Sequence, residues 1–263
     1  AQNGLSILMD LDMNLGSENM KLLWDTGATP EVMLHNLYAL HIDPEEIDLT
    51  CLSHGHSDHT GGLMGVLQRR RAPVPIVAHP DIFAPKLKVR PFLKYIGAPF
   101  TRDQLEAAGG IMLPCRGPVT LAPGVMTTGE VPRMEALETV EGFWTMKNDQ
   151  YTPDAMPDDQ SLAIHLPGKG LVVISGCAHS GIINTIRYAQ RITGEERLYA
   201  VIGGFHLMGA DNKRIDATAR ALLDLDPAVV RPGHCTGQKA LSRLQDILGE
   251  SCQPLAVGDS IEF

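Results

Sequence analysis

Apolar residues in this chain recur at two spacings, one typical of buried strands and one typical of helices with a single apolar face. The continuous apolar runs that predict buried strands in the final third lie at residues 170–175, 198–202 and 228–230. Helical spacing follows each run, at residues 182–192, 215–225 and 241–248. Strand and helix therefore alternate, which predicts a sheet of parallel strands with helices packed on it.

The beginning of the chain predicts a hairpin followed by further alternation. Strands are expected at residues 5–12 and 21–24, joined by a polar loop of Asn, Gly and Ser. Thr29-Pro30 suits the cap and first turn of a helix, and residues 47–52 predict another strand. The short strands expected at the end of the chain lie near residues 255–257 and 261–263.

The pattern weakens between residues 86 and 160, where Pro, Gly and Met are frequent and only 119–121 and 125–128 look like short strands. We interpret this segment as an excursion around the mouth of an active site. A small accessory packing layer is the alternative, because Met and aromatic residues fill irregular cores as readily as pockets. With 263 residues and 44% hydrophobic content, the chain can bury one large core. We therefore predict a single domain over residues 1–263.

The composition of the chain limits the classes of partner and the cellular compartment that we expect. The 31 acidic and 22 basic residues give a net charge of −9, which disfavours nucleic acid as a partner. The five cysteines are odd in number and irregularly spaced, which argues against a disulfide framework and favours the reducing cytoplasm. No apolar stretch approaches the roughly 20 residues of a membrane span, and the first residues lack the parts of a signal peptide. We expect a cytoplasmic protein with no membrane partner; its oligomeric state stays open.

Residues 51–62 carry the strongest chemical signal and read Cys-Leu-Ser-His-Gly-His-Ser-Asp-His-Thr-Gly-Gly. Imidazole nitrogen and carboxylate oxygen suit zinc first, with manganese and iron as alternatives. His54 and His56 point to the same side of an extended segment, so they can share one ion. Asp58 and His59 lie beyond the turn, placed for a second ion. The alternative is a polar loop whose histidines happen to cluster.

Three more histidines, His179, His206 and His234, follow predicted strands and have glycine nearby. Parallel strands place their carboxyl ends at one edge of a sheet, so we expect these side chains to meet the first motif. Glycine allows the backbone to come close to the ions. Asp25 ends another strand, in Trp-Asp-Thr-Gly, and its carboxylate can accept the second N–H of a metal-bound imidazole.

These motifs together resemble the signature of the metallo-β-lactamase superfamily over nearly the whole chain. The resemblance implies an α/β fold, an αβ/βα sandwich of the metallo-β-lactamase type, with a dinuclear metal site. The implied ligands are His54, His56 and His179 for the first ion, and Asp58, His59 and His234 for the second. Asp25 is implied as the group that orients a ligand histidine.

The sequence leaves the identity of one metal ligand undecided. The superfamily pattern supplies a bridging aspartate after the strand that ends here in Gly-Gly-Phe-His206, and no aspartate stands there. His206 replaces that bridge, binds the second ion or contacts the substrate; it and Asp58 are the candidate catalytic residues. Cys177 and Cys235 adjoin predicted ligands. As small buried residues they need no special role, and soft ligation is the alternative.

Longer motifs resemble a narrower branch, the archaeal-type 7,8-dihydropterin-6-methyl-4-(β-D-ribofuranosyl)aminobenzene-5′-phosphate synthases and their bacterial relatives. They are Ser-His-Gly-His-Ser-Asp-His-Thr-Gly-Gly, Gly-Cys-Ala-His-Ser-Gly-Ile-Ile-Asn, Gly-Gly-Phe-His-Leu and His-Cys-Thr-Gly. This resemblance implies a dihydropterin-methyl diphosphate:arylamine transferase that releases pyrophosphate. A hydrolase of a phosphodiester, ester, thioester or lactone is the alternative, because a dimetal site stabilises a departing diphosphate as readily as it activates water. A catalytically silent, metal-containing binding protein is the second alternative.

A small-molecule substrate of the pterin or phosphorylated kind needs apolar walls for its ring and a cation for its diphosphate. Phe143, Trp144 and Met146 are candidate walls, and Arg133 is the candidate cation because a guanidinium suits bidentate phosphate contact. Asp159, in Asp-Asp-Gln, is a further candidate for substrate binding.

Overall fold

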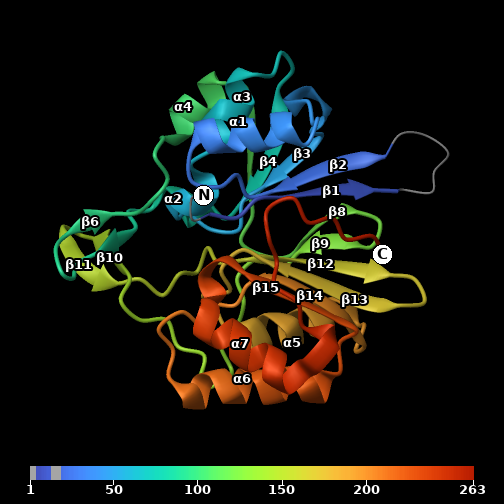
Figure 1. Ribbon diagram of the computed structural model, residues 1–263. Coiled ribbons are helices and arrows are strands. Elements are labelled where there is room, and N and C mark those ends of the chain that lie inside the picture. The colour runs from blue at the N-terminus through green and yellow to red at the C-terminus, as the bar shows by residue number, and fades with distance from the viewer. Residues whose placement is uncertain (1–3, 13–18) are drawn as a thin grey trace. The chain divides into compact units, whose positions relative to one another are not determined.

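The computed structural model describes residues 4–12 and 19–263 of the chain (Figure 1). Its contacts group into two compact units. The first unit comprises Ala1–Arg116 and Val140–Asp158, and the second comprises Gly117–Thr139 and Asp159–Phe263. Each unit has its own main sheet and its own hydrophobic core. The prediction of a single domain stays a prediction.

The main sheet of the first unit has the strand order β1-β2-β3-β4-β7, in which β1 and β2 are antiparallel and the others parallel. Its strands are β1 (Ile7–Leu11), β2 (Met20–Trp24), β3 (Leu49–Cys51), β4 (Val74–Ala78) and β7 (Gly110–Pro114). Its helices are α1 (Pro30–Ala39), α2 (Ser57–Thr60), α3 (Leu63–Gln68) and α4 (Arg102–Ala107), with 3-10 turns η1 (Pro44–Glu46) and η2 (Pro80–Phe83). The predicted antiparallel pairing of the first two strands is confirmed, while residues 13–18 of the polar loop expected between them lie outside the described residues. The predicted helix start is also confirmed, because the Thr29 side chain caps α1 by accepting from the Val32 N–H.

A smaller sheet of the first unit has the order β11-β10-β5-β6 (Figure 1). Its strands are β5 (Leu87–Lys88), β6 (Lys94–Tyr95), β10 (Trp144–Lys147) and β11 (Gln150–Pro153). These strands, α4 and β7 all fall in the segment 86–160, where the sequence predicted only two short strands, at residues 119–121 and 125–128. A strand of two residues shows too little alternation to be recognised from sequence.

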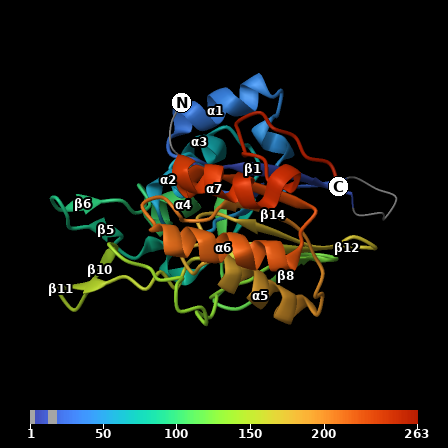
Figure 2. The ribbon, with the colours of Figure 1, turned by 60° about the horizontal axis from the view of Figure 1, so that its bottom comes forward.

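The main sheet of the second unit has the order β15-β14-β13-β12-β9-β8. Its strands are β8 (Val119–Ala122), β9 (Val125–Thr127), β12 (Ser161–Leu166), β13 (Gly170–Ser175), β14 (Leu198–Gly204) and β15 (Val229–Gly233). Its helices are α5 (Ile182–Thr193), α6 (Asn212–Leu225) and α7 (Gln238–Leu248), with 3-10 turns η3 (His234–Thr236) and η4 (Gly249–Ser251). β13, β14 and β15 are parallel, as the alternation predicts. Figure 2 shows the ribbons of these three helices. Their buried residues pack against the sheet in one apolar cluster.

The prediction of short strands at the end of the chain is wrong: residues 255–257 and 261–263 lie outside every strand that the structure describes. The Gln253 and Leu255 N–H groups instead donate to the Val230 and Pro232 carbonyls of β15, so only isolated hydrogen bonds form. Among the described residues, no helix has both the length and the apolar composition that crossing a membrane requires.

Candidate metal centre

Three imidazoles of the first unit lie together in the segment Ser53–His59, here called the histidine loop. The loop follows β3, and His56 stands at the cap of the short helix α2. His54 Nε2 lies 3.0 Å from His56 Nδ1, and the His54 and His59 ring centroids are 4.2 Å apart. Zn–N distances of about 2.0–2.1 Å separate two tetrahedral ligands by about 3.3 Å, so the His54–His56 spacing fits a shared ion. The predicted ligand Asp58 is half-buried in α2.

Asp25 supports the histidine loop from the end of β2. Its Oδ2 lies 2.6 Å from His59 Nδ1 and accepts from Ser53 Oγ at 2.7 Å, while its Oδ1 accepts from the Ser53 N–H at 2.7 Å. The Ser53 hydroxyl is in turn 2.9 Å from His54 Nδ1. The fully buried carboxylate therefore orients His59 directly and His54 through Ser53. With Nδ1 of His59 bonded to Asp25, Nε2 is the nitrogen suited to an ion.

The second unit gathers its predicted ligands at the carboxyl ends of three parallel strands. β13, β14 and β15 deliver His179, His206 and His234 respectively, and the ring centroids of His179 and His206 are 4.2 Å apart. His206 and His234 have positive φ angles of 45° and 50°, which turn the chain sharply after the strand. The His206 ring thus lies beside that of His179.

Two thiols belong to the same group, and we call Cys177, His179, His206, His234 and Cys235 the strand-end cluster. Ligand atoms of Cys177, His179 and His206 lie within 4.8 Å of one another, as do those of Cys177, His234 and Cys235. Cys177 is common to both sets. Sulfur and imidazole donors at this spacing fit a borderline-soft ion such as zinc. Sequence reasoning favoured a packing role for both thiols and kept soft ligation as the alternative, since each stands within two positions of a predicted ligand.

Electrostatics in the strand-end cluster favour thiolate. Burial acts to raise the pKa of the Cys235 thiol, but hydrogen bonds with Cys177 and His206 and the charge of His234 outweigh it. The pKa of Cys235 consequently lies well below its usual value. Cys252, elsewhere in the same unit, shows the opposite case, since burial raises its pKa to about 11.

The predicted substrate residues of the second unit contact the loop after His179. The Asp159 carboxylate is buried and accepts from the Ser180 N–H at 2.8 Å, and Arg133 donates to the Ser180 hydroxyl at 3.3 Å. Burial raises the pKa of Asp159, and the hydrogen bonds from Ser180 and His179 oppose that rise. Both residues therefore sit next to a predicted ligand.

The predicted substrate residues of the first unit flank its small sheet. The Phe143 ring centroid lies 5.0 Å from that of His56, and Lys88 Nζ lies 5.4 Å from the Phe143 centroid. Trp144 begins β10 and pairs with Leu87. Met146 is 42% exposed, so its thioether is available to a ligand. Phe143 therefore contacts the histidine loop through the His56 imidazole.

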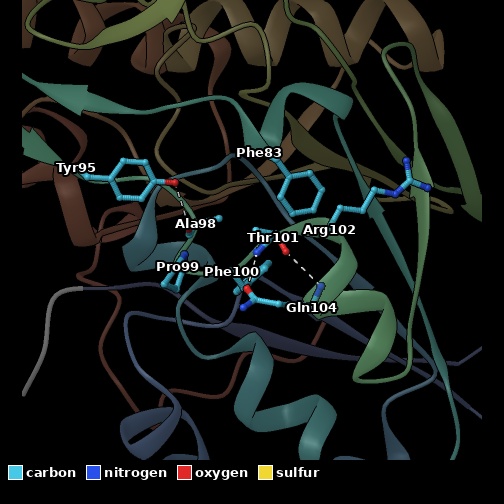
Figure 3. A pocket seen from close by; sticks show the side chains of 8 residues that line it. All are labelled: Phe83, Tyr95, Ala98, Pro99, Phe100, Thr101, Arg102 and Gln104. Atoms are coloured by element: carbon cyan, nitrogen blue, oxygen red, sulfur yellow. Dashed lines mark hydrogen bonds between the residues drawn. The ribbon is translucent and has the colours of Figure 1, made fainter.

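A pocket of about 360 Å³ in the first unit is walled by Phe83, Tyr95 and Phe100, with Arg102 at its rim (Figure 3). Its wall is bonded to the histidine loop, because the Ser57 N–H donates to the Ile96 carbonyl and His56 forms a bridge with Gly97. Arg102 pairs with Glu106, so the pocket offers aromatic surface with a neutralised charge at its edge. A hollow of about 590 Å³ at the end of α5 is lined by Gln190, Arg191, Gly194 and Glu196, none of which is a predicted site residue.

Comparisons with known proteins show which family and which relatives the chain is similar to. A family model described as the metallo-beta-lactamase superfamily matches residues 14–234. A 7,8-dihydropterin-6-methyl-4-(beta-D-ribofuranosyl)-aminobenzene-5′-phosphate synthase of Methanocaldococcus jannaschii is 36% identical over 269 aligned positions, covering 100% of this chain and 90% of the synthase. An uncharacterized protein of the same organism is 30% identical, covering 94% of this chain and 89% of that protein. The crystal structure of Tm1679, described as a metal-dependent hydrolase of the beta-lactamase superfamily, is similar with a TM-score of 0.80 at 25% identity and 98% coverage of each chain.

Proposed function

Because the chain belongs to the metallo-β-lactamase superfamily, we propose that its predicted ligands hold two divalent ions, with zinc as the first candidate and manganese or iron as alternatives. The chain is a metal-dependent enzyme of this superfamily. The proposed ligands follow the resemblance: His54, His56 and His179 for the first ion, and Asp58, His59 and His234 for the second. The short His54–His56 distance and the paired nitrogen and sulfur donors of the strand-end cluster support this assignment.

Cys177 is the group we propose in place of the missing bridging aspartate. Its sulfur lies within 4.8 Å of ligand atoms in both candidate sets of the strand-end cluster, so Cys177 would be within reach of the ions held by His179 and by His234. A thiolate, like a carboxylate, brings one negative charge to the ions. His206 shares one of these sets, and of the three roles open to it we propose contact with the substrate.

The reaction we propose is transfer of a dihydropterin-methyl group from its diphosphate to an arylamine. The amine nitrogen forms a bond to the methylene carbon, the bond from that carbon to the diphosphate oxygen breaks, and pyrophosphate leaves with the electron pair. Bound divalent ions would supply Lewis-acid stabilisation for the departing diphosphate. His206 is proposed to accept the proton that the amine releases, and Arg133 to pair with the diphosphate. The observation that carries the proposal is the full-length similarity to the synthase.

Aromatic walls for the pterin ring are present at two places in the first unit. Phe143 beside His56 is the first candidate, and the pocket lined by Phe83, Tyr95 and Phe100 is the second. Both contact the histidine loop or the chain bonded to it, which is what a substrate subsite requires.

Hydrolysis is the second candidate function, favoured by the similarity to a metal-dependent hydrolase. Incubation with dihydropterin-methyl diphosphate, with and without an arylamine, separates the two. Pyrophosphate release that requires the amine, and is lost in Arg133→Ala while the metal content is unchanged, supports the transferase. Release to water alone, or brisk cleavage of a phosphodiester or ester without transfer, contradicts it.

A further inference from the structure

Lys86, in the first unit, is a lysine whose charged side chain is buried, although lysines ordinarily lie at the surface. Its side chain is 1% exposed, and Nζ lies 2.5 Å from Asp158 Oδ1 and 3.1 Å from Asp154 Oδ2. An unpaired buried ammonium is costly, so this lysine depends on its two carboxylates. Burial acts to lower the pKa of Lys86, and the carboxylates outweigh that effect, so the side chain stays charged.

Asp158 connects this ion triad to the histidine loop. While Oδ1 binds Lys86, Oδ2 accepts from the Gly55 N–H at 2.8 Å. Gly55 stands between His54 and His56 and is closely enclosed, because an added Cβ would lie 2.4 Å from the Ile82 carbonyl oxygen. The carboxylate therefore fixes a peptide group with little room to move.

A second connection reaches the other side of His56. The Lys86 carbonyl accepts from the Ile96 N–H at 2.9 Å, and the Ile96 carbonyl accepts from the Ser57 N–H at 2.8 Å. Residue 86 is thus linked to Gly55 through its side chain and to Ser57 through its backbone. These are the two neighbours of His56.

We propose that Lys86 and Asp158 are positioning residues, which hold the backbone on both sides of His56 and so set the direction of its imidazole toward a metal ion. This inference rests on the proposed role of His56 as a ligand. Outer groups that orient ligands commonly contribute 10–100-fold to metal affinity. A carboxylate that binds a backbone N–H and a buried ammonium at once is suited to that task, because neither of its oxygens is free to rotate away.

The decisive variant is Asp158→Asn, with Asp154→Asn as its matched control. Asparagine has one acceptor oxygen and one NH₂ group, so it must turn a donor toward Lys86 Nζ or the Gly55 N–H, both of which are donors. Asp154→Asn also removes a carboxylate from Lys86, but the other hydrogen bond that the Asp154 side chain accepts comes from the Met156 N–H and not from the histidine loop. The pair thus separates the loss of a buried charge from the loss of support for His56.

The zinc affinity of the folded proteins would be measured by competition with a chromophoric chelator. The geometry of the metal site would be compared through the visible absorption spectra of the Co(II)-substituted proteins. We expect Asp158→Asn to weaken zinc binding about 10–100-fold and to change the Co(II) spectrum, with Asp154→Asn within about threefold of the natural chain. Equal affinities for the two folded variants would overturn the proposal. If Asp158→Asn does not fold, Lys86→Arg keeps the charge and displaces it; unchanged affinity and spectrum in that variant would overturn the proposal equally.

His56→Ala makes the two levels of the argument distinguishable. If His56→Ala binds zinc as the natural chain does, the ligand assignment fails and the positioning role fails with it. If His56→Ala loses metal and Asp158→Asn does not, only the positioning role is wrong.

Discussion

The histidine loop and the strand-end cluster present similar donors on different supports. In the histidine loop, three imidazoles come from six consecutive positions and are oriented by buried carboxylates, Asp25 and Asp158. In the strand-end cluster, each imidazole follows a different strand, and the register of the parallel sheet brings them together. Metal binding by the histidine loop should therefore weaken when the charge of Asp25 or Asp158 is lost. Metal binding by the strand-end cluster should depend on its own donor side chains and on its backbone.

The largest effect is expected from removing one ligand of the loop. His56→Ala should lower the metal content by about one ion per chain, because two imidazoles at the His54–His56 spacing are expected to share that ion. Elemental analysis of the purified protein measures this. His165→Ala is the matched control, since this histidine lies in β12, is partly exposed and pairs with Glu195. A His56→Ala protein with the metal content of the control would refute the assignment.

The strand-end cluster is best tested through its sulfur. Cys177→Ser should abolish the near-ultraviolet thiolate-to-metal absorption of the Co(II) protein and weaken metal binding at least about tenfold, because a hydroxyl does not ionise as a thiol does. Cys252→Ser is the control: its thiol is also buried in the second unit, and burial raises its pKa to about 11. Persistence of the absorption in Cys177→Ser, with its loss in Cys235→Ser, would transfer the role to Cys235.

A smaller effect is expected from the support of His59. Asp25→Asn should keep the fold but lower metal affinity about 10–100-fold, because a neutral amide no longer raises the basicity of the imidazole. The buried Ser53 hydroxyl and N–H, which both bond to Asp25, would retain one acceptor. Isothermal titration with zinc measures the change. Affinity and activity equal to those of the natural chain would leave Asp25 with a purely structural role in the turn after β2.

The positions of the strand-end histidines after three parallel strands follow from two general rules. Apolar periodicity locates β13, β14 and β15, and parallel strands end at one edge, so His179, His206 and His234 had to be neighbours. Lys86 had no comparable signal. A lysine is ordinarily a surface residue, and its partners Asp154 and Asp158 lie about seventy positions later in an aperiodic segment. Buried charge networks are fixed by tertiary structure alone, which is why Lys86 and Asp158 were missed as supports of the histidine loop, whereas Asp25 was predicted.

Asp158 and Asp159 allow a direct comparison of the histidine loop with the strand-end cluster, because these consecutive residues belong to different units. Asp158 binds the Gly55 N–H with a buried lysine as counter-ion, whereas Asp159 binds the Ser180 N–H beside His179. In Asp159→Asn the amide oxygen can still accept from the Ser180 N–H, so that hydrogen bond is kept. We therefore expect metal affinity to fall by less than about tenfold, a smaller loss than in Asp158→Asn.

The same variant has a defined effect on stability. Burial raises the pKa of Asp159, so the folded chain keeps a proton at pH values where the unfolded chain, with an aspartate pKa of about 3.9, has released it. The folded state then binds more protons than the unfolded state, and the free energy of unfolding contributed by this group falls as pH rises from that value through the raised pKa. Asparagine does not titrate. In urea unfolding of the metal-free proteins, the free energy of unfolding of Asp159→Asn should therefore rise relative to that of the natural chain as pH rises through this window. If the free energies of unfolding of the two proteins change with pH in parallel, the expected shift is contradicted.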